Sequence, residues 1–149
     1  MVSGTARKVA EYEGTELPSS DYNEEDITAP PASGTNAPDT MIIVPCSVKT
    51  LGKIANGISD NLITRTAEVC LKERKKLVLV LRETPLSYIT IENMRKVTLA
   101  GGIVLPASPG FYHKPKSIDD LVEYVVEKIL NVAGVEHHPK IKWEGEVLG

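Results

Sequence analysis

Short apolar runs alternate with amphipathic stretches along most of the chain. Continuous apolar runs with the composition of strands buried on both faces occur at residues 41–45, 76–81 and 102–106. Apolar positions at helical spacing predict helices over residues 48–58, 62–74, 90–99 and 117–130. Strands that alternate with helices predict an α/β fold. We expect a three-layer, Rossmann-like or flavodoxin-like parallel sheet with helices on both faces.

The N-terminal region is less regular. Residues 1–3 resemble the end of a strand that runs into a short helix, with Ser3 as its N-cap. Residues 14–40 form a loop rich in Pro, Gly and Ser that is longer than a simple connector. We expect one α/β domain over residues 1–135, followed by a C-terminal tail at 136–149. Because a domain rarely begins with a strand end, we also expect a further segment upstream.

Composition excludes several classes of function. The net charge of -3 argues against a nucleic-acid binder, which would carry an excess of basic side chains. The longest apolar run is far shorter than the roughly 18 residues of a membrane span, and no signal-peptide pattern opens the chain. Cys46 and Cys70 are predicted to be reduced, buried thiols of a cytoplasmic protein. No metal site is expected, since the adjacent His137 and His138 do not face one point.

Polar side chains follow the first two predicted strands. In a parallel sheet, ligands bind beyond the carboxyl ends of the strands. Ser47 and Thr50 open a predicted helix there, which indicates either plain N-capping or an anion site. Arg82 and Glu83 follow the second strand and form either a surface ion pair or a site for phosphate binding and proton transfer.

Two further groups offer cations or a base. The loop after the third strand carries Tyr112, His113 and Lys114 between prolines. His113 is a nominal general base, although an isolated histidine is more often inert. Arg65 and Lys72 lie seven residues apart, and thus on one face of a basic helix. That face is either solvated or directed into an anion pocket.

Seven segments, taken in order, resemble the flavin prenyltransferase family. They are PASG at 31–34, VPCSVKTL at 44–51, DNLITR at 60–65, LKER at 71–74, LVLRETPL at 79–86, ENM at 92–94 and PGFYHKP at 109–115. The resemblance covers residues 1 to 135. It implies an enzyme that makes prenylated FMN from reduced FMN and dimethylallyl monophosphate without a metal. It further implies a partner decarboxylase that receives the product, as in ubiquinone synthesis, and a trimer-based homo-oligomer, usually a dodecamer, with sites between subunits.

The resemblance also implies roles for individual residues. It assigns flavin contacts to helix-start and basic residues, namely Ser3, Ser47, Val48, Lys49, Thr50, Arg65 and Arg82. It assigns the prenyl phosphate and its pocket to cationic and aromatic residues, namely Lys72, Arg82, Tyr112, Lys128 and Trp143. Glu83 and Glu13 resemble the family's active-site carboxylates. Lys128 stands where some members have arginine, so a point charge replaces a bidentate fork.

One family element is missing from the sequence. Members begin with a strand and a Gly-Ala-Ser-Gly phosphate-binding turn, ahead of the segment that starts here. We expect that the recorded chain lacks this N-terminal part, and loss of activity is the other interpretation. Two alternative functions stay open: an FMN-dependent decarboxylase of cysteine-type substrates, and a non-catalytic flavin-binding subunit. The decarboxylases carry PASANT where this chain has PASGTN at 31–36, and their Met-Asn substrate clamp is not found.

Overall fold

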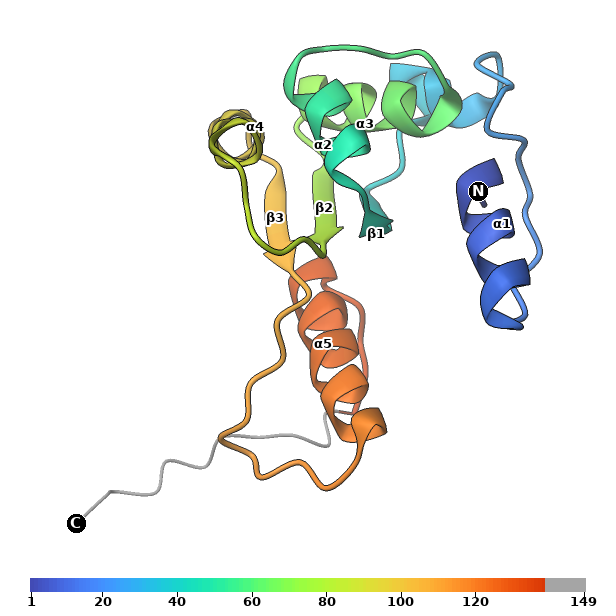
Figure 1. Ribbon diagram of the computed structural model, residues 1–149. Coiled ribbons are helices and arrows are strands. Elements are labelled where there is room, and N and C mark those ends of the chain that lie inside the picture. Colours follow the sequence, from blue (N-terminus) through green and yellow to red (C-terminus); the bar gives the residue numbers. More distant parts are fainter. Residues whose placement is uncertain (139–149) are drawn as a thin grey trace.

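The centre of the fold is a small parallel sheet. The computed structural model describes residues 1–138, and its sheet has the strand order β1-β2-β3 (Figure 1). The strands are β1 (Thr40–Cys46), β2 (Lys76–Leu81) and β3 (Ile103–Pro106). Both pairs, β1 with β2 and β2 with β3, are parallel. The three apolar runs therefore form the predicted strands.

Helices cover both faces of this sheet, which confirms the predicted three-layer architecture. The helices are α2 (Val48–Ala55), α3 (Leu62–Lys72), α4 (Tyr88–Leu99) and α5 (Ile118–Ala133). Leu77 and Leu79 of β2 pack in one core cluster with residues of α2, α3 and α4. Val78 and Val80 point to the opposite face and pack against Ile129 of α5. None of the helices that the structure describes is both long and apolar enough to cross a membrane.

The N-terminal helix α1 (Gly4–Glu13) stands apart from the sheet (Figure 1). The predicted strand at residues 1–3 is wrong, because these residues are irregular. The backbone N–H of Val2 donates to Ser20 Oγ at 3.2 Å rather than to a neighbouring strand. Within the predicted loop, the short 3₁₀ helices η1 (Pro30–Ala32) and η2 (Gly34–Asn36) form, and Ala32 packs on Leu62 of α3.

Capping explains where the helices differ from the predicted boundaries. Helix α4 begins two residues earlier than predicted because Ser87 Oγ accepts a hydrogen bond from the backbone of Thr90 at 3.1 Å. Helix α2 ends early, since Gly57 takes a left-handed conformation with φ of 68°. Gly134 does the same after α5, with φ of 77°, and this helix continues to Ala133.

The start of α5 gives a prediction for pH dependence. Asp120 accepts hydrogen bonds from the backbone of Lys116 at 2.7 Å and of Ser117 at 3.0 Å, and these bonds hold its pKa below the ordinary value of an aspartate. A carboxylate with a lowered folded-state pKa stabilises the fold above its unfolded pKa, and that contribution is lost as the pH falls through the folded value. We expect Asp120→Asn to be less stable than wild type near neutrality and equally stable in strong acid.

Denaturant unfolding at the two pH values measures this difference. Asp119→Asn is the matched control, because Asp119 lies in the same first turn and its substitution by asparagine removes the same charge. Asp120→Asn could lose as much stability at low pH as near neutrality, or no more stability than Asp119→Asn. Either result would show that the backbone hydrogen bonds of the Asp120 carboxylate do not stabilise the fold specifically.

Candidate active site

The carboxyl ends of all three strands meet at one edge of the sheet. Cys46 at the end of β1 pairs with Leu81 of β2, and Leu81 pairs with Pro106 of β3. Beyond this point, the N–H of Ala107 donates to the carbonyl of Leu81 at 2.7 Å. The segments that begin at Ser47, Arg82 and Ala107 are therefore neighbours, as the sequence predicted for ligand-binding loops of a parallel sheet.

The first of these segments opens α2. Ser47 Oγ accepts a hydrogen bond from the N–H of Thr50 at 3.2 Å and lies 3.1 Å from Thr50 Oγ1. This is the N-cap that the sequence allowed. Within residues 1–138, the N–H groups of Val48 and Lys49 have no acceptor. Free N–H groups and the positive end of the helix dipole can therefore bind an anion here, in addition to the cap.

The second segment carries Arg82 and Glu83, both exposed. Glu83 Oε1 accepts a hydrogen bond from the N–H of Thr84 at 3.0 Å. Among the described residues, Glu83 and Arg82 form no ion pair with each other, unlike the surface pair that the sequence left open. A carboxylate and a guanidinium are thus both presented at the edge of the sheet.

The third segment brings Tyr112 and Lys128 together through a residue that sequence reasoning missed. Tyr112 donates a hydrogen bond from its hydroxyl to that of Tyr124 at 3.2 Å, with the ring centroids 5.8 Å apart. Lys128 Nζ lies 5.8 Å from the centre of the Tyr124 ring, and His113 stacks on that ring at 5.2 Å. The spacing of four residues between Tyr124 and Lys128 was the available signal, because it places both on one helix face.

Lys72 lies at the opposite edge of the sheet, away from the carboxyl ends of the strands. It ends α3, four residues before β2 begins, so it sits beside the amino ends of the strands. Its ammonium pairs with Glu73. Arg65, two turns earlier, donates from Nε to the carbonyl of Ala32 at 3.2 Å. A Cβ on Gly34 would lie 2.8 Å from Lys72 Nζ, so Arg65 and Lys72 both face the segment that contains η1 and η2.

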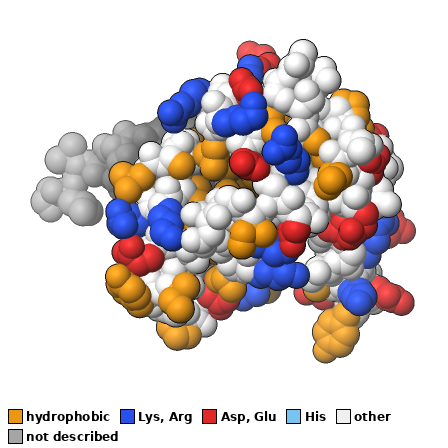
Figure 2. Space-filling model, turned by 90° about the horizontal axis from the view of Figure 1, so that it is seen from above, with side chains coloured by type: hydrophobic (Ala, Val, Ile, Leu, Met, Phe, Trp, Pro, Cys, Tyr) orange, Lys and Arg blue, Asp and Glu red, His pale blue; other side chains and the backbone are white. Residues whose placement is uncertain are grey.

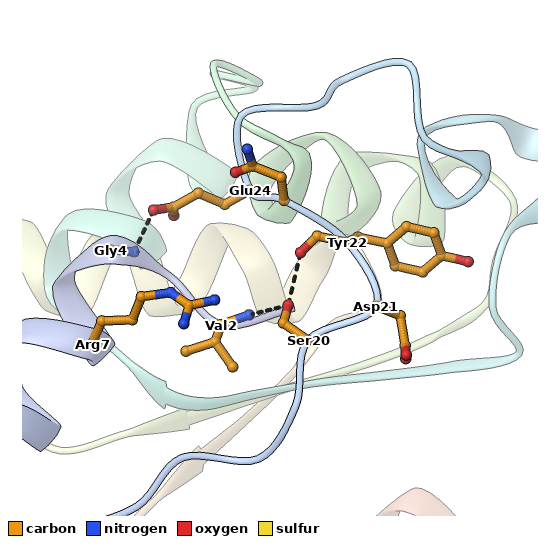
Figure 3. Close-up of a pocket in the computed structure, with 8 residues that line it drawn as sticks. Val2, Gly4, Arg7, Ser20, Asp21, Tyr22 and Glu24 are labelled. Carbon is orange, nitrogen blue, oxygen red and sulfur yellow. Dashed lines mark hydrogen bonds between the residues drawn. The ribbon is translucent and has the colours of Figure 1, made fainter.

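The N-terminal candidates lie on or near α1, apart from the carboxyl edge of the sheet. Ser3 Oγ caps α1 by accepting from the N–H of Ala6 at 3.0 Å. Beside it, the start of α1 and residues 20–24 line a cavity of about 420 Å³. There the N–H of Gly4 donates to the carboxylate of Glu24 (Figure 3). Glu13 is exposed at the other end of α1, and Trp143 lies outside the described residues.

Burial and hydrogen bonding shift the pKa values of two groups near the carboxyl edge, Cys46 and Tyr112. Burial raises the pKa of the Cys46 thiol to about 12, so this thiol stays protonated at neutral pH. The hydrogen bond to Tyr124 raises the pKa of Tyr112, because it is made by the proton that ionisation would remove. Seen from above, Lys and Arg side chains are interspersed with Asp, Glu and apolar side chains (Figure 2). Binding of an anion therefore depends on particular donors rather than on a uniformly basic surface.

Comparisons with known proteins agree with this arrangement. A family model described as Flavoprotein matches residues 4–130. A flavin prenyltransferase UbiX from Thermoplasma acidophilum is 49% identical over 150 residues, covering 96% of this chain and 83% of the relative. The crystal structure of AnUbiX (PadA1) in complex with FMN and dimethylallyl pyrophosphate has a TM-score of 0.90 at 43% identity, covering 97% of this chain and 81% of that chain.

A dodecameric FMN-dependent UbiX-like decarboxylase from Escherichia coli O157:H7 is also similar. Its crystal structure has a TM-score of 0.89 at 40% identity and covers 96% of this chain and 81% of that chain. Identity of this extent, over nearly the whole chain and together with the shared fold, identifies the family. The chain belongs to the flavin prenyltransferases, within the flavoprotein family.

Proposed function

We propose that this chain transfers a dimethylallyl group from dimethylallyl monophosphate to reduced FMN, at the carboxyl edge of its sheet. The observation that carries this proposal is the convergence of three strand ends, through the pairing of Cys46 with Leu81 and of Leu81 with Pro106. It brings helix N–H groups, a guanidinium, a carboxylate and the start of the loop that carries Tyr112 to one edge. Membership of the family supports the same reaction, because its relatives are flavin prenyltransferases.

The start of α2 fits one end of the flavin cofactor. The N–H groups of Val48 and Lys49, which have no acceptor in the described part of the chain, and the hydroxyls of Ser47 and Thr50 form a donor set suited to an anionic or carbonyl-rich group. Ser3 joins these contacts in the proposal. When bound, reduced FMN supplies the nucleophilic ring that accepts the prenyl group.

Cations and a phenol hold the prenyl phosphate in this proposal. Arg82 lies at the end of β2, between the start of α2 and the loop of Tyr112, where it can contact both flavin and phosphate. Tyr112 and Lys128 approach from the third segment. Negative charge grows on the phosphate as its bond to carbon breaks, and fixed cations stabilise that charge.

Lys72 serves the site of a neighbouring copy. Its place beside the amino ends of the strands separates it from Arg82 within one chain. A homo-oligomer can bring the Lys72 edge of one copy to the Arg82 edge of the next. Arg65 lies on the same helix face as Lys72 and lines the pocket with it. Trp143, which lies outside the described residues, completes the predicted pocket.

Glu83 is the proposed acid–base group. Closing a second bond between the prenyl chain and the flavin requires proton transfers, and an exposed carboxylate beside Arg82 can mediate them, as can the released phosphate. Glu13, at the end of α1, is the second proposed carboxylate. No step assigned to this chain requires a metal.

The proposed reaction fits an oligomeric enzyme that supplies a second protein. The similar Escherichia coli protein is dodecameric, which supports a trimer-based homo-oligomer for this chain. Prenylated FMN is then passed to a partner decarboxylase. A cytoplasmic location and the transfer of the product to a partner decarboxylase remain predictions.

Mass spectrometry of the flavin tests the proposed function. Purified protein, given reduced FMN and dimethylallyl monophosphate, is expected to release a flavin that is heavier by one five-carbon unit. Unchanged FMN after incubation would contradict the reaction. Release of carbon dioxide from a cysteinyl substrate would favour the decarboxylase alternative, whereas bound FMN with neither product would favour the non-catalytic one.

A further inference from the structure

Tyr124 lies at the centre of the cluster formed by α5 and the loop after β3. Its hydroxyl accepts a hydrogen bond from the hydroxyl of Tyr112 at 3.2 Å, and the two rings pack edge to face with their centroids 5.8 Å apart. His113 stacks on its ring, with planes 3° apart. Lys128 Nζ lies 5.8 Å from its centroid. One partly buried side chain thus contacts two of the residues proposed to bind the prenyl phosphate.

The loop is shaped to fit this pair of rings. A Cβ on Gly110 would lie 2.7 Å from the ring of Tyr112 and 3.2 Å from Cζ of Tyr124. The first distance is shorter than real Cβ contacts and the second is tight, so an added Cβ would displace the ring of Tyr112. The nitrogens of His113 are buried without hydrogen-bond partners among residues 1–138, which makes its ring a packing surface for Tyr124.

We propose that Tyr124 is a positioning residue for the prenyl phosphate, with its hydroxyl orienting Tyr112 and its ring orienting Lys128. This inference rests on the proposed function, because it assigns Tyr112 and Lys128 to the phosphate. A phenol hydroxyl both donates and accepts. When phosphate arrives, the proton of Tyr112 turns to it, while the proton of Tyr124 turns to the oxygen of Tyr112. Hydrogen bonds in such a chain polarise and strengthen one another.

The ring of Tyr124 restricts the mobile ammonium of Lys128. Lysine is flexible and loses considerable rotamer entropy when it is held in one place. A cation above an aromatic face is attracted by the ring, and the spacing of four residues along α5 keeps Tyr124 and Lys128 on the same helix face. Part of the cost of ordering Lys128 is therefore met before the phosphate binds, which favours tighter binding.

Two substitutions separate the hydroxyl from the ring. Tyr124→Phe removes one neutral hydrogen bond and is expected to raise the KM for dimethylallyl monophosphate about two- to tenfold. Tyr124→Leu also removes the ring, and its KM is expected to rise roughly five- to fiftyfold. The affinity for FMN is expected to change little, and kcat is expected to fall by a smaller factor than KM rises, because the lost contacts orient Tyr112 and Lys128 mainly for binding of the phosphate.

Controls and a second readout make the test independent of a folding defect. Tyr88→Phe is the matched control, because Tyr88 is 75% exposed at the start of α4. Gly110→Ala, which displaces Tyr112, is expected to raise the same KM, while Gly52→Ala, whose new Cβ makes an ordinary contact with Asn93 at 3.5 Å, is not. In Tyr124→Phe, titration of the phenols by ultraviolet absorbance is expected to show a lower pKa for Tyr112.

The outcomes distinguish this inference from the reaction itself. A wild-type protein that leaves FMN unmodified overturns the proposed function together with the inference. A wild-type protein that prenylates FMN, combined with an unchanged KM in Tyr124→Phe and Tyr124→Leu, overturns only the role of Tyr124. Loss of kcat without a change in KM would also contradict it, because a positioning role in phosphate binding appears in KM.

Discussion

Glu83→Gln is expected to bind FMN as tightly as the wild type and to form prenylated flavin about 10²–10⁴-fold more slowly. Glutamine keeps the size of the side chain and can still accept a hydrogen bond from the N–H of Thr84, as Glu83 does at 3.0 Å. It cannot exchange a proton. The substitution therefore removes proton transfer while it preserves the local geometry.

Single-turnover formation of the product, followed by mass spectrometry, measures this effect, and FMN fluorescence measures binding. Glu25→Gln is the control, since Glu25 is an exposed glutamate of the loop after α1. Turnover equal to wild type would remove Glu83 from the mechanism and leave the protons to the released phosphate. Weakened FMN binding would instead make Glu83 a binding residue.

Lys72→Ala and Arg82→Ala are each expected to reduce turnover by about 10²–10³-fold, because each removes a cation that stabilises the leaving phosphate. Mixed oligomers of the two variants are expected to regain activity. Lys72 and Arg82 lie at opposite edges of the sheet in one chain. A site between two copies therefore takes Lys72 from one copy and Arg82 from the other. In an equal mixture, about a quarter of such sites contain both native residues.

Co-expression of the two variants, with tags to isolate mixed oligomers, gives the measurement. Lys8→Ala, at an exposed position of α1, replaces Lys72→Ala in the control mixture, where every site keeps Lys72 and about half of the sites keep Arg82. Mixed oligomers of Lys72→Ala and Arg82→Ala that stay as inactive as either parent would contradict a site shared between copies.

Much of the fold was predictable because its signals are local. Runs such as residues 76–81 are apolar at nearly every position, which is required of a strand buried on both faces. Ser117 and Asp120 mark the start of α5 by reciprocal hydrogen bonds, and Gly134 marks its end. The early start of α4 was missed although Ser87 carried the signal, because the apolar side chains of Tyr88 and Ile89 in its first turn are exposed and do not follow the spacing of a buried helix face.

The parts that could not be predicted depend on contacts between distant residues. A strand at residues 1–3 requires a neighbour to complete its hydrogen bonds, and Val2 instead bonds to Ser20. Tyr124 resembles any partly buried residue of an amphipathic helix until the loop of Tyr112 folds against it. The separation of Lys72 from Arg82 follows from the antiparallel course of α3 and β2, which residue type alone does not reveal.

A crystal structure of the protein with FMN and dimethylallyl monophosphate tests the central claim most directly. The account predicts the flavin at the carboxyl edge of the sheet, in contact with the start of α2 and with Arg82. It predicts the phosphate within hydrogen-bond distance of Arg82 and Tyr112. Flavin bound elsewhere, for example in the cavity between α1 and residues 20–24, would contradict the account.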